Sequence, residues 1–117
     1  MQYLCLFYGE EKALDALSKD EMQDLVDESL AYDEVLRKSG HYLESAALQR
    51  VETGKTVRVR NRKMAITDGP FAETKEQLLG FILIDARDLN DAVQVAAKIP
   101  SASTGSIEVR PVLELEG

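Results

Sequence analysis

The chain has 117 residues, of which 44% are hydrophobic and 30% are charged, a composition typical of a globular protein. Its formal net charge of −7 argues against general nucleic-acid binding, which requires a basic surface. No stretch approaches the ~18 apolar residues of a membrane span. We therefore expect a single domain over residues 1–117 that has neither nucleic acid nor a membrane as its partner.

The sequence contains one cysteine, Cys5, so no disulfide can form within the chain. This usage is typical of a reducing compartment, and the run 1–8 lacks the basic leader and small-residue cleavage site of a signal peptide. A nucleophilic Cys5 would need a cation close by in sequence to lower its pKa, and none is there. We expect a cytoplasmic protein with Cys5 buried.

The first predicted element is a central strand at residues 1–8, which are β-formers with apolar side chains on both faces. Residues 9–17 are expected to form a loop. Ser18-Lys19-Asp20-Glu21 is a capping box, which predicts a helix from there to about Ser39. Gly40 is expected to end that helix in a left-handed conformation.

The middle of the chain is predicted to form short strands. Residues 41–48 indicate a weak second strand, and residues 56–60 alternate like a half-buried strand. A turn at residues 61–63 leads into a short partner strand over 64–67. Asp68-Gly69-Pro70 is typical of a tight turn.

The last third begins with a predicted strand over 78–85 that is apolar on both faces. Asp88 is expected to cap a second helix whose apolar stripe comprises Leu89, Ala92, Val93, Ala96 and Ile99. The final strand is expected over 107–115, where Pro111 favours an edge or a bulge. The order β-α-β-(β-β)-β-α-β predicts an α+β fold, the ferredoxin-like βαββαβ arrangement with an inserted β-hairpin.

Two helices can cover only one face of a four-stranded sheet, yet both central strands are apolar on both faces. In one strand Tyr3, Cys5 and Phe7 oppose Leu4, Leu6 and Tyr8; in the other Leu79, Phe81 and Leu83 oppose Leu78, Ile82 and Ile84. Leaving the side chains of the uncovered face in water would cost roughly 9–18 kcal/mol of hydrophobic stabilisation. The net stability of a whole domain is only ~5–15 kcal/mol. We predict a homodimer packed sheet against sheet, unless long loops fold over this face.

The first predicted helix carries polar residues within its apolar stripe. The stripe consists of Met22, Leu25, Val26, Leu30 and Leu36. Ser29 and Asp33 fall at its centre, one turn apart. The functional interpretation is a cleft between this helix and the sheet, with Asp33 as a candidate acid or base and Ser29 as a substrate-binding candidate. Alternatively, Asp33 is partly solvated and bonded to an amide or an arginine.

The segment 67–76 gathers charged and hydroxyl side chains around a rigid turn. Asp68 and Glu73 are candidate catalytic acids, and Lys75 is a candidate anion-binding residue in the same carboxylate–ammonium cluster. In the structural alternative, Asp68 accepts the amides of its own turn and Phe71, also a substrate-binding candidate, fills the core.

A basic strip made of Arg50, Lys55, Arg58, Arg60, Arg62 and Lys63 crosses this acidic chain. Arg58 shares a strand face with Arg60 and is a candidate for binding an anionic substrate, although such residues also form the wet side of hairpins or pair with a partner's acids. His41 is the only histidine and is a candidate base or substrate-binding residue. We expect neither a metal nor a cofactor.

The run Thr67-Asp68-Gly69-Pro70-Phe71-Ala72-Glu73-Thr74-Lys75-Glu76, followed by Gly80-Phe81 and Ile84-Asp85-Ala86, resembles the signature of the YCII-related (DGPF) family. The resemblance continues through 96–100, Gly105 and 107–112, includes Tyr32, Gly40 and Leu48, and so covers nearly the whole chain. It implies a ferredoxin-like fold in a dimeric α/β-barrel assembly. It does not deliver a function, because most of the family is uncharacterised.

Some members of the broader YCII group are thought to be enzymes that use a His–Asp pair, with the histidine on the first helix, and one lineage acts in chloroaromatic breakdown. This chain has Ser29 and no histidine in that stretch, so the pair cannot be carried over. DGPF proteins are often associated with extracytoplasmic-function sigma factors, which implies a regulatory or accessory role by analogy.

Three hypotheses therefore stand. The chain is a cofactor-independent enzyme that acts on a small anionic or aromatic substrate by acid–base chemistry. Alternatively, it is a ligand-sensing or accessory module with a regulatory protein partner. In the third hypothesis, the DGPF segment is purely structural.

Overall fold

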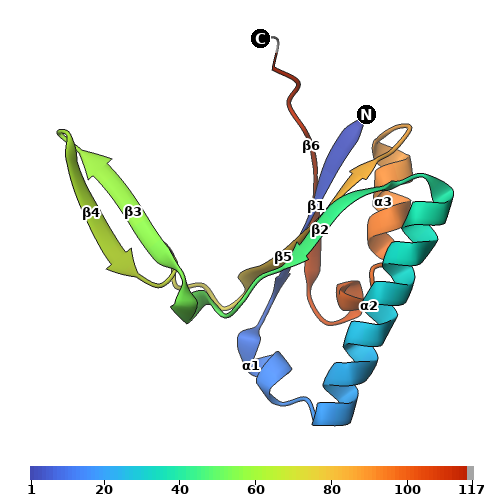
Figure 1. Ribbon diagram of the computed structural model, residues 1–117, viewed down its shortest axis with the longest axis horizontal. Coiled ribbons are helices and arrows are strands. Elements are labelled where there is room, and N and C mark those ends of the chain that lie inside the picture. The colour runs from blue at the N-terminus through green and yellow to red at the C-terminus, as the bar shows by residue number, and fades with distance from the viewer. Residues whose placement is uncertain (116–117) are drawn as a thin grey trace.

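The computed structural model describes residues 1–115, and residues 116–117, the end of the predicted domain, lie outside the described residues. The strands are β1 Gln2–Gly9, β2 Tyr42–Ala47, β3 Lys55–Arg60, β4 Lys63–Asp68, β5 Gln77–Asp85 and β6 Ser106–Pro111. The α-helices are α1 Glu11–Asp15, α2 Lys19–Ser39 and α3 Leu89–Ala97, and short 3₁₀ turns lie at Val51–Thr53 and Pro100–Ser103. Helices α2 and α3 lie on one side of the sheet (Figure 1).

The main sheet has four strands in the order β2-β5-β1-β6, and every neighbouring pair is antiparallel. The two strands that are apolar on both faces, β1 and β5, are the central ones, as predicted. The β3–β4 hairpin is inserted between β2 and β5 and forms its own two-stranded sheet. This mixed α+β arrangement is compatible with a ferredoxin-like fold.

Strand β6 is an edge strand, which accommodates Pro111 at its end. The predicted strand over 107–115 is too long. Its neighbour β1 begins at Gln2, whose carbonyl oxygen accepts a bond from the Val112 amide, so the chain beyond that point runs past the end of β1.

Helix α2 begins and ends as the sequence predicted. The Glu21 amide donates to the Ser18 hydroxyl at 3.1 Å, and the Ser18 amide donates to the Glu21 carboxylate at 3.0 Å, which completes the capping box. Gly40 ends the helix with a φ of 80°, a left-handed conformation that glycine adopts without strain.

The expectation of a loop over residues 9–17 is wrong in part, because α1 occupies Glu11–Asp15. The segment consists of good helix formers, and Glu11 in its first turn is favourable for the helix dipole. A helix of this length spans little more than one turn and has few internal hydrogen bonds. It contains too few apolar residues to show a helical period in the sequence.

The core lies between the helices and the upper part of the sheet. Tyr3 and Ile84 face each other across β1 and β5 and are almost completely buried, and Leu36 of α2 packs on them. Helix α3 contributes Ala92 and Ala96 to the same cluster. Their small side chains let the helix approach the sheet closely.

The predicted apolar stripe of the second helix is only partly correct. Ala92 and Ala96 are buried as expected, but Val95 is the third buried residue, whereas Leu89 and Val93 are exposed. Val95 lies three residues after Ala92 and therefore shares its face, while Val93 is rotated by about 100°.

The face of the sheet opposite the helices remains open. Leu4 and Leu6 of β1 lie beside Leu83 and Phe81 of β5 on this face, and all four stay partly exposed. Leu79 was predicted to share their face, but a bulge shifts the β1–β5 register between Phe7 and Tyr8, and Leu79 is buried instead.

The β3–β4 hairpin, residues 55–68, is called the arm below. It leaves the sheet and projects away from the helices (Figure 1). Its tip residues, Asn61 and Arg62, have positive φ angles of 52° and 63°, as in a type I′ turn. Because of the arm, the radius of gyration is 16.2 Å, compared with ~13 Å for a compact chain of this length. Within residues 1–115, no helix is long and apolar enough to cross a membrane.

Candidate functional site

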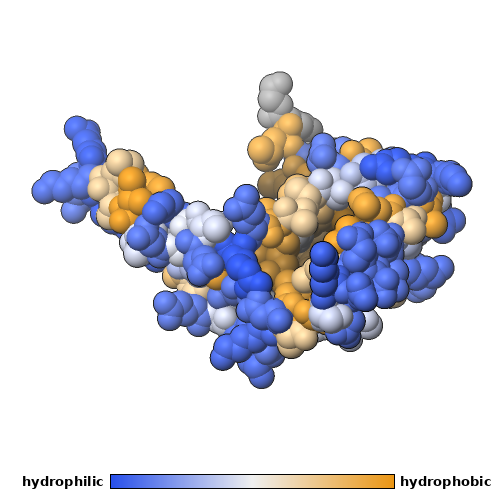
Figure 2. All heavy atoms as spheres, turned by 60° about the horizontal axis from the view of Figure 1, so that its bottom comes forward, coloured by the Kyte–Doolittle hydropathy of each residue, from blue (hydrophilic) through white to orange (hydrophobic). Residues whose placement is uncertain are grey.

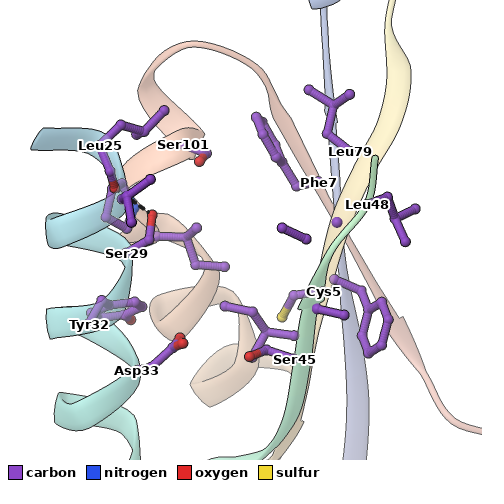
Figure 3. A pocket seen from close by; sticks show the side chains of 18 of the residues that line it. Cys5, Phe7, Leu25, Ser29, Tyr32, Asp33, Ser45, Leu48, Leu79 and Ser101 are labelled. Carbon is purple, nitrogen blue, oxygen red and sulfur yellow. Dashed lines mark hydrogen bonds between the residues drawn. The ribbon is translucent and has the colours of Figure 1, made fainter. Parts of the chain in front are cut away.

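A pocket of about 480 Å³ lies between α2 and the lower half of the sheet. Most of its wall is aliphatic or aromatic, with Phe7 and Ile82 from the sheet and Leu25 and Met22 from the helix. In Figure 2, hydrophobic side chains gather in the hollow at the centre of the molecule, with hydrophilic side chains around it. The close-up in Figure 3 shows the helix and the sheet as facing walls.

The pocket exists because the strands carry small side chains where the helix would otherwise pack. In register across the sheet, Ser45 and Cys5 flank Ile82, and Ala47 and Phe7 flank Gly80. A side chain at Gly80 is excluded, because its Cβ would lie 2.8 Å from the Ala46 carbonyl oxygen. These small residues leave a volume that the side chains of α2 do not fill.

The helix side of the pocket contains Ser29, Tyr32 and Asp33 (Figure 3). The Tyr32 hydroxyl donates a 2.6 Å hydrogen bond to the Val95 carbonyl oxygen, which ties this wall to α3. The Ser29 hydroxyl donates to the Leu25 carbonyl oxygen at 2.8 Å. Ser29 therefore satisfies its donor within the helix and keeps its lone pairs for a ligand.

Asp33 is one of two acids that line this largely apolar pocket, and the other, Glu11, accepts a 3.0 Å hydrogen bond from the Val51 amide. Burial raises the pKa of Asp33 above the ordinary value, and the neighbouring Glu34 acts in the same direction. Arg37 and the Ser45 hydroxyl oppose this rise because both favour the charged carboxylate. Asp33 and Ser45 point toward each other across the pocket (Figure 3). The carboxyl is thus disposed to exchange a proton with a bound molecule.

A second layer of polar groups supports the Asp33 end. The Ser45 and Tyr42 hydroxyls form a 2.7 Å hydrogen bond, and the Arg37 guanidinium lies 4.3 Å from the centre of the Tyr42 ring. This chain of contacts fixes the Ser45 rotamer from outside the pocket.

Cys5 lies in the pocket wall, and the expectation that it is buried is confirmed. Burial raises the pKa of its thiol to about 11. Burial also raises the pKa of Tyr32, and the nearby Cys5 adds to this effect. Near neutral pH the sulfur is therefore a small apolar group rather than a nucleophile.

The DGPF segment lies elsewhere, at the base of the arm. Asp68, Glu73 and Lys75 line one open depression, but they do not pair with one another: Asp68 forms an ion pair with Lys55, and the Lys75 ammonium lies 3.3 Å from the Glu10 carboxylate. The structural interpretation that Phe71 fills the core is wrong, because its side chain is 79% exposed. The prediction that Phe71 fills the core rested only on the apolar character of its side chain.

Backbone contacts give Gly69 a defined role at that base. Its φ is 83°, and its amide donates to the Gly54 carbonyl oxygen at 2.9 Å. Its own carbonyl oxygen accepts a 2.9 Å hydrogen bond from the Thr56 hydroxyl. These bonds close the base of the arm, so the turn sets where the arm leaves the sheet.

Two further candidates lie outside the pocket. Arg58 is exposed on the arm. The His41 ring bonds to the Ser39 hydroxyl at 2.7 Å and to the Asp91 carboxylate at 3.1 Å, and it lines a depression with Arg87. The Arg87 amide and then His41 lower the pKa of Asp91. His41 thus links the start of β2 to the first turn of α3.

The structure therefore brings Ser29 and Asp33 together in the pocket and distributes the other candidates over the surface. Sequence reasoning missed Tyr32 and Ser45 as pocket residues. The signal that could have found them is the run of small side chains at Ser45 and Ala47, which is unusual for a strand that a helix covers. Among residues 1–115, no group of three His, Cys, Asp or Glu side chains is placed to hold a metal ion.

The family model of the YCII-related domain matches residues 1–116. The chain belongs to the YCII-related family. The fold and the DGPF turn described above are therefore features of a YCII-related domain. An uncharacterized protein of Rhizobium meliloti (strain 1021) is 39% identical over 114 residues, which cover 96% of this chain and 92% of that protein.

Proposed function

We propose that this YCII-related domain binds a small, largely apolar organic molecule between α2 and the sheet, and that Asp33 exchanges a proton with it. The observation that carries the proposal is the position of the Asp33 carboxyl at one end of a largely apolar pocket, whose other charged residues, Glu11 and Arg50, already bond to Val51 and Asp15. A volume of about 480 Å³ is within the range of small-molecule sites. The reaction class is cofactor-independent acid–base chemistry.

The residues that line the pocket restrict the class of ligand that fits it. Asp33 repels an anion, and Arg50, the basic residue of the lining, already forms an ion pair with Asp15. A neutral aromatic or aliphatic body with one hydrogen-bonding group therefore fits better than an anionic substrate. The group would lie near Asp33 and Ser45, and the body would contact Phe7. We assign no role in this pocket to Asp68, Glu73, Lys75, Phe71, Arg58 or His41.

A screen of neutral aromatic fragments by thermal shift and NMR tests this site. Fragments should stabilise the wild type, and Ala47→Leu, which fills the pocket floor, should abolish the effect. Asp33→Asn should weaken fragments that carry a hydrogen-bonding group, whereas Asp24→Asn, which is exposed on the opposite side of α2, should not. Undiminished binding to a folded Ala47→Leu variant would place the ligand elsewhere.

The second candidate function is a sensor or accessory module that uses the same pocket without turnover. It is favoured by the hydrogen bonds that hold Ser45 and Tyr32 in fixed positions, which suit binding as well as catalysis. Mass spectrometry of each bound fragment after incubation distinguishes the two. Conversion that Asp33→Asn removes and Asp24→Asn retains identifies an enzyme, and unchanged fragments identify a binding module.

We also propose that the domain is a homodimer in which the open faces of two sheets pack together as an α/β barrel. Leu6 and Phe81 pair across the two central strands, β1 and β5, and both stay partly exposed on this face. The chain exposes 8687 Å², roughly 2,300 Å² more than expected for a monomer of its mass. Two copies together carry roughly 4,600 Å² of excess surface, which lies within the range of about 2,000–5,000 Å² that an obligate homodimer buries in total.

Light scattering at micromolar concentration tests the assembly. We expect a dimer for the wild type and dissociation for Leu6→Lys, which places a charge at the centre of the face. The control is Val93→Lys, which is 44% exposed on α3 on the other side of the sheet and should leave the mass unchanged. A monomeric wild type would contradict the proposed assembly.

A further inference from the structure

The arm has one apolar face and one basic face. Cross-strand pairs place Val57 opposite Ile66 and Val59 opposite Met64 on one face. These four side chains are 56–67% exposed. Figure 2 shows hydrophobic side chains on the projecting arm, with hydrophilic side chains at its tip. An isolated two-stranded hairpin is marginally stable in water, so a face of this kind requires a covering surface.

The charge on the arm requires a partner as well. Arg58, Arg60, Arg62 and Lys63 lie on its other face and at its tip, and none of the four forms an ion pair within residues 1–115. Helix α2 has the opposite character, with seven acidic residues and three basic ones. The chain therefore carries both a basic and an acidic surface, which favours contact between two copies.

A matching apolar surface lies at the mouth of the pocket. Val26 and Leu30 of α2 are 42% and 60% exposed, and both line the pocket. Strand β2, on the other wall of the pocket, is an edge strand. Asp27 and Glu34 are exposed on the same helix. The mouth is thus an apolar strip with acids next to it, complementary to the arm.

The arm is long enough to reach this strip on a partner. Its six-residue strands span about 20 Å at ~3.4 Å per residue. Two packed sheets lie about 10 Å apart, and a helix layer adds about 10 Å more. An arm that passes the edge of the partner's sheet therefore ends at the level of the partner's α2.

We propose that each arm crosses to the second copy of the chain and packs its apolar face on Val26 and Leu30, so that it closes the mouth of the partner's pocket. The inference rests on the proposed dimer and the proposed pocket. In this arrangement two chains together form the complete binding site. Val59 and Met64, near the tip of the arm, form part of its lid. The basic side chains of Arg62 and Lys63 at the tip of the arm contact the acids of α2.

Nucleic acid is the competing occupant of a basic hairpin. The arm's apolar face has no counterpart in a phosphate backbone, and the net charge of −7 opposes binding to one. The acidic, partly apolar strip on α2 is complementary to both the apolar face and the basic tip of the arm, so a second copy is the occupant that the observations favour.

Cross-linking between chains tests the arm directly. One sample carries Val59→Cys on the arm, and a second, distinguishable by mass, carries Leu30→Cys on α2. After subunit exchange, a short bis-maleimide should join the two chains, and each variant alone should give far less product. The matched control is Val35→Cys, which is 56% exposed but lies on the other side of α2. The buried Cys5 remains in all samples, with the wild type as the blank.

The outcomes separate the arm from the rest of the proposal. A heterodimer yield severalfold higher at Leu30 than at Val35 supports the crossing. Equal yields, or no cross-link in a protein that scatters as a dimer, overturn it and leave the dimer and the Asp33 pocket standing. A monomer overturns both crossing and dimer, while fragment binding tests the pocket separately. Binding of a DNA duplex that an Arg58→Glu/Arg60→Glu variant loses, without a Leu30 cross-link, would assign the arm to nucleic acid.

Discussion

The Tyr32 hydroxyl on α2 donates a 2.6 Å hydrogen bond to the Val95 carbonyl oxygen on α3. The two helices also meet in the core, where Leu36 belongs to the same cluster as Val95, and this bond adds a polar link between them across 63 residues of sequence. It also fixes the Tyr32 ring as the side wall of the pocket, because the ring cannot turn without breaking the bond.

Removing this hydroxyl should destabilise the protein while sparing its apolar binding surface. Tyr32→Phe leaves the ring but deletes the donor, and the loss of one such bond costs about 1 kcal/mol, more if the carbonyl stays dry. Urea unfolding should report this loss. Fragments without polar groups should bind with unchanged affinity. A variant as stable as the wild type would show that the bond contributes nothing.

The stability of Asp33→Asn relative to the wild type should depend on pH. Burial raises the pKa of this carboxyl in the folded state, so its contribution to stability is present below the unfolded pKa, ~3.9, and is lost as pH rises through the folded pKa. At pH values above the folded-state pKa, the wild type has an unfavourable, partly buried negative charge at Asp33, and Asp33→Asn removes this charge. The variant should gain in stability relative to the wild type as pH rises from about 3 to 7.

Urea midpoints measured across this pH range check the expectation. Asp27→Asn removes one charge from the exposed side of the same helix and controls for the change in net charge. A stability difference for Asp33→Asn that runs in the opposite direction, with the variant weakest near neutral pH, would mean that the carboxylate is stabilised in the folded state.

Cys5 should react slowly with thiol reagents in the folded protein. Burial raises its pKa to about 11, and at pH 8 only about 0.1% of such a thiol is thiolate. Ellman's reagent should therefore modify the native protein slowly and the protein in concentrated guanidinium chloride at once. A ligand in the pocket should slow the native reaction further, because Cys5 lines the wall. Rapid native modification would show that the wall opens readily.

Two glycines should respond to alanine substitution for different reasons. At Gly105 a Cβ would lie 2.3 Å from the Tyr8 carbonyl oxygen, a clash with backbone, so we expect a loss of at least about 2 kcal/mol. At Gly40 an added Cβ would have no neighbouring atom within 4 Å, so only the φ of 80° should lower the free energy of unfolding, by about 1 kcal/mol. Thermal denaturation checks the order, and a smaller loss at Gly105 would reverse the argument.

The sequence predicted well the features that depend on neighbouring residues. The capping box at Ser18 and the left-handed Gly40 are local chemistry, and both are confirmed. The central position of β1 and β5 followed from strands that are apolar on both faces, because only central strands bury both. The inward position of Ser29 and Asp33 followed from helical periodicity alone.

The parts that could not be predicted depend on register and on distance through space. The pocket forms where Cys5 of β1 and Gly80 of β5 align across the sheet with residues of β2. A bulge beside Phe7 places Leu79 on the other face of the sheet from the one that strict alternation along the strand predicts. Asp68 and Lys75 are close in sequence, but each pairs with a residue from another segment. No periodicity in the chain records such contacts.

The hollow beneath α2 depends on the identity of a few side chains on strands whose backbone hydrogen bonds are indifferent to that identity. Exchanging Ser45 or Ala47 for a bulkier or more polar residue would alter which molecules fit while leaving the architecture intact. Relatives that share this scaffold can therefore diverge in the compounds they accept through one or two codon changes, and likeness of fold alone is a poor guide to what each of them recognises.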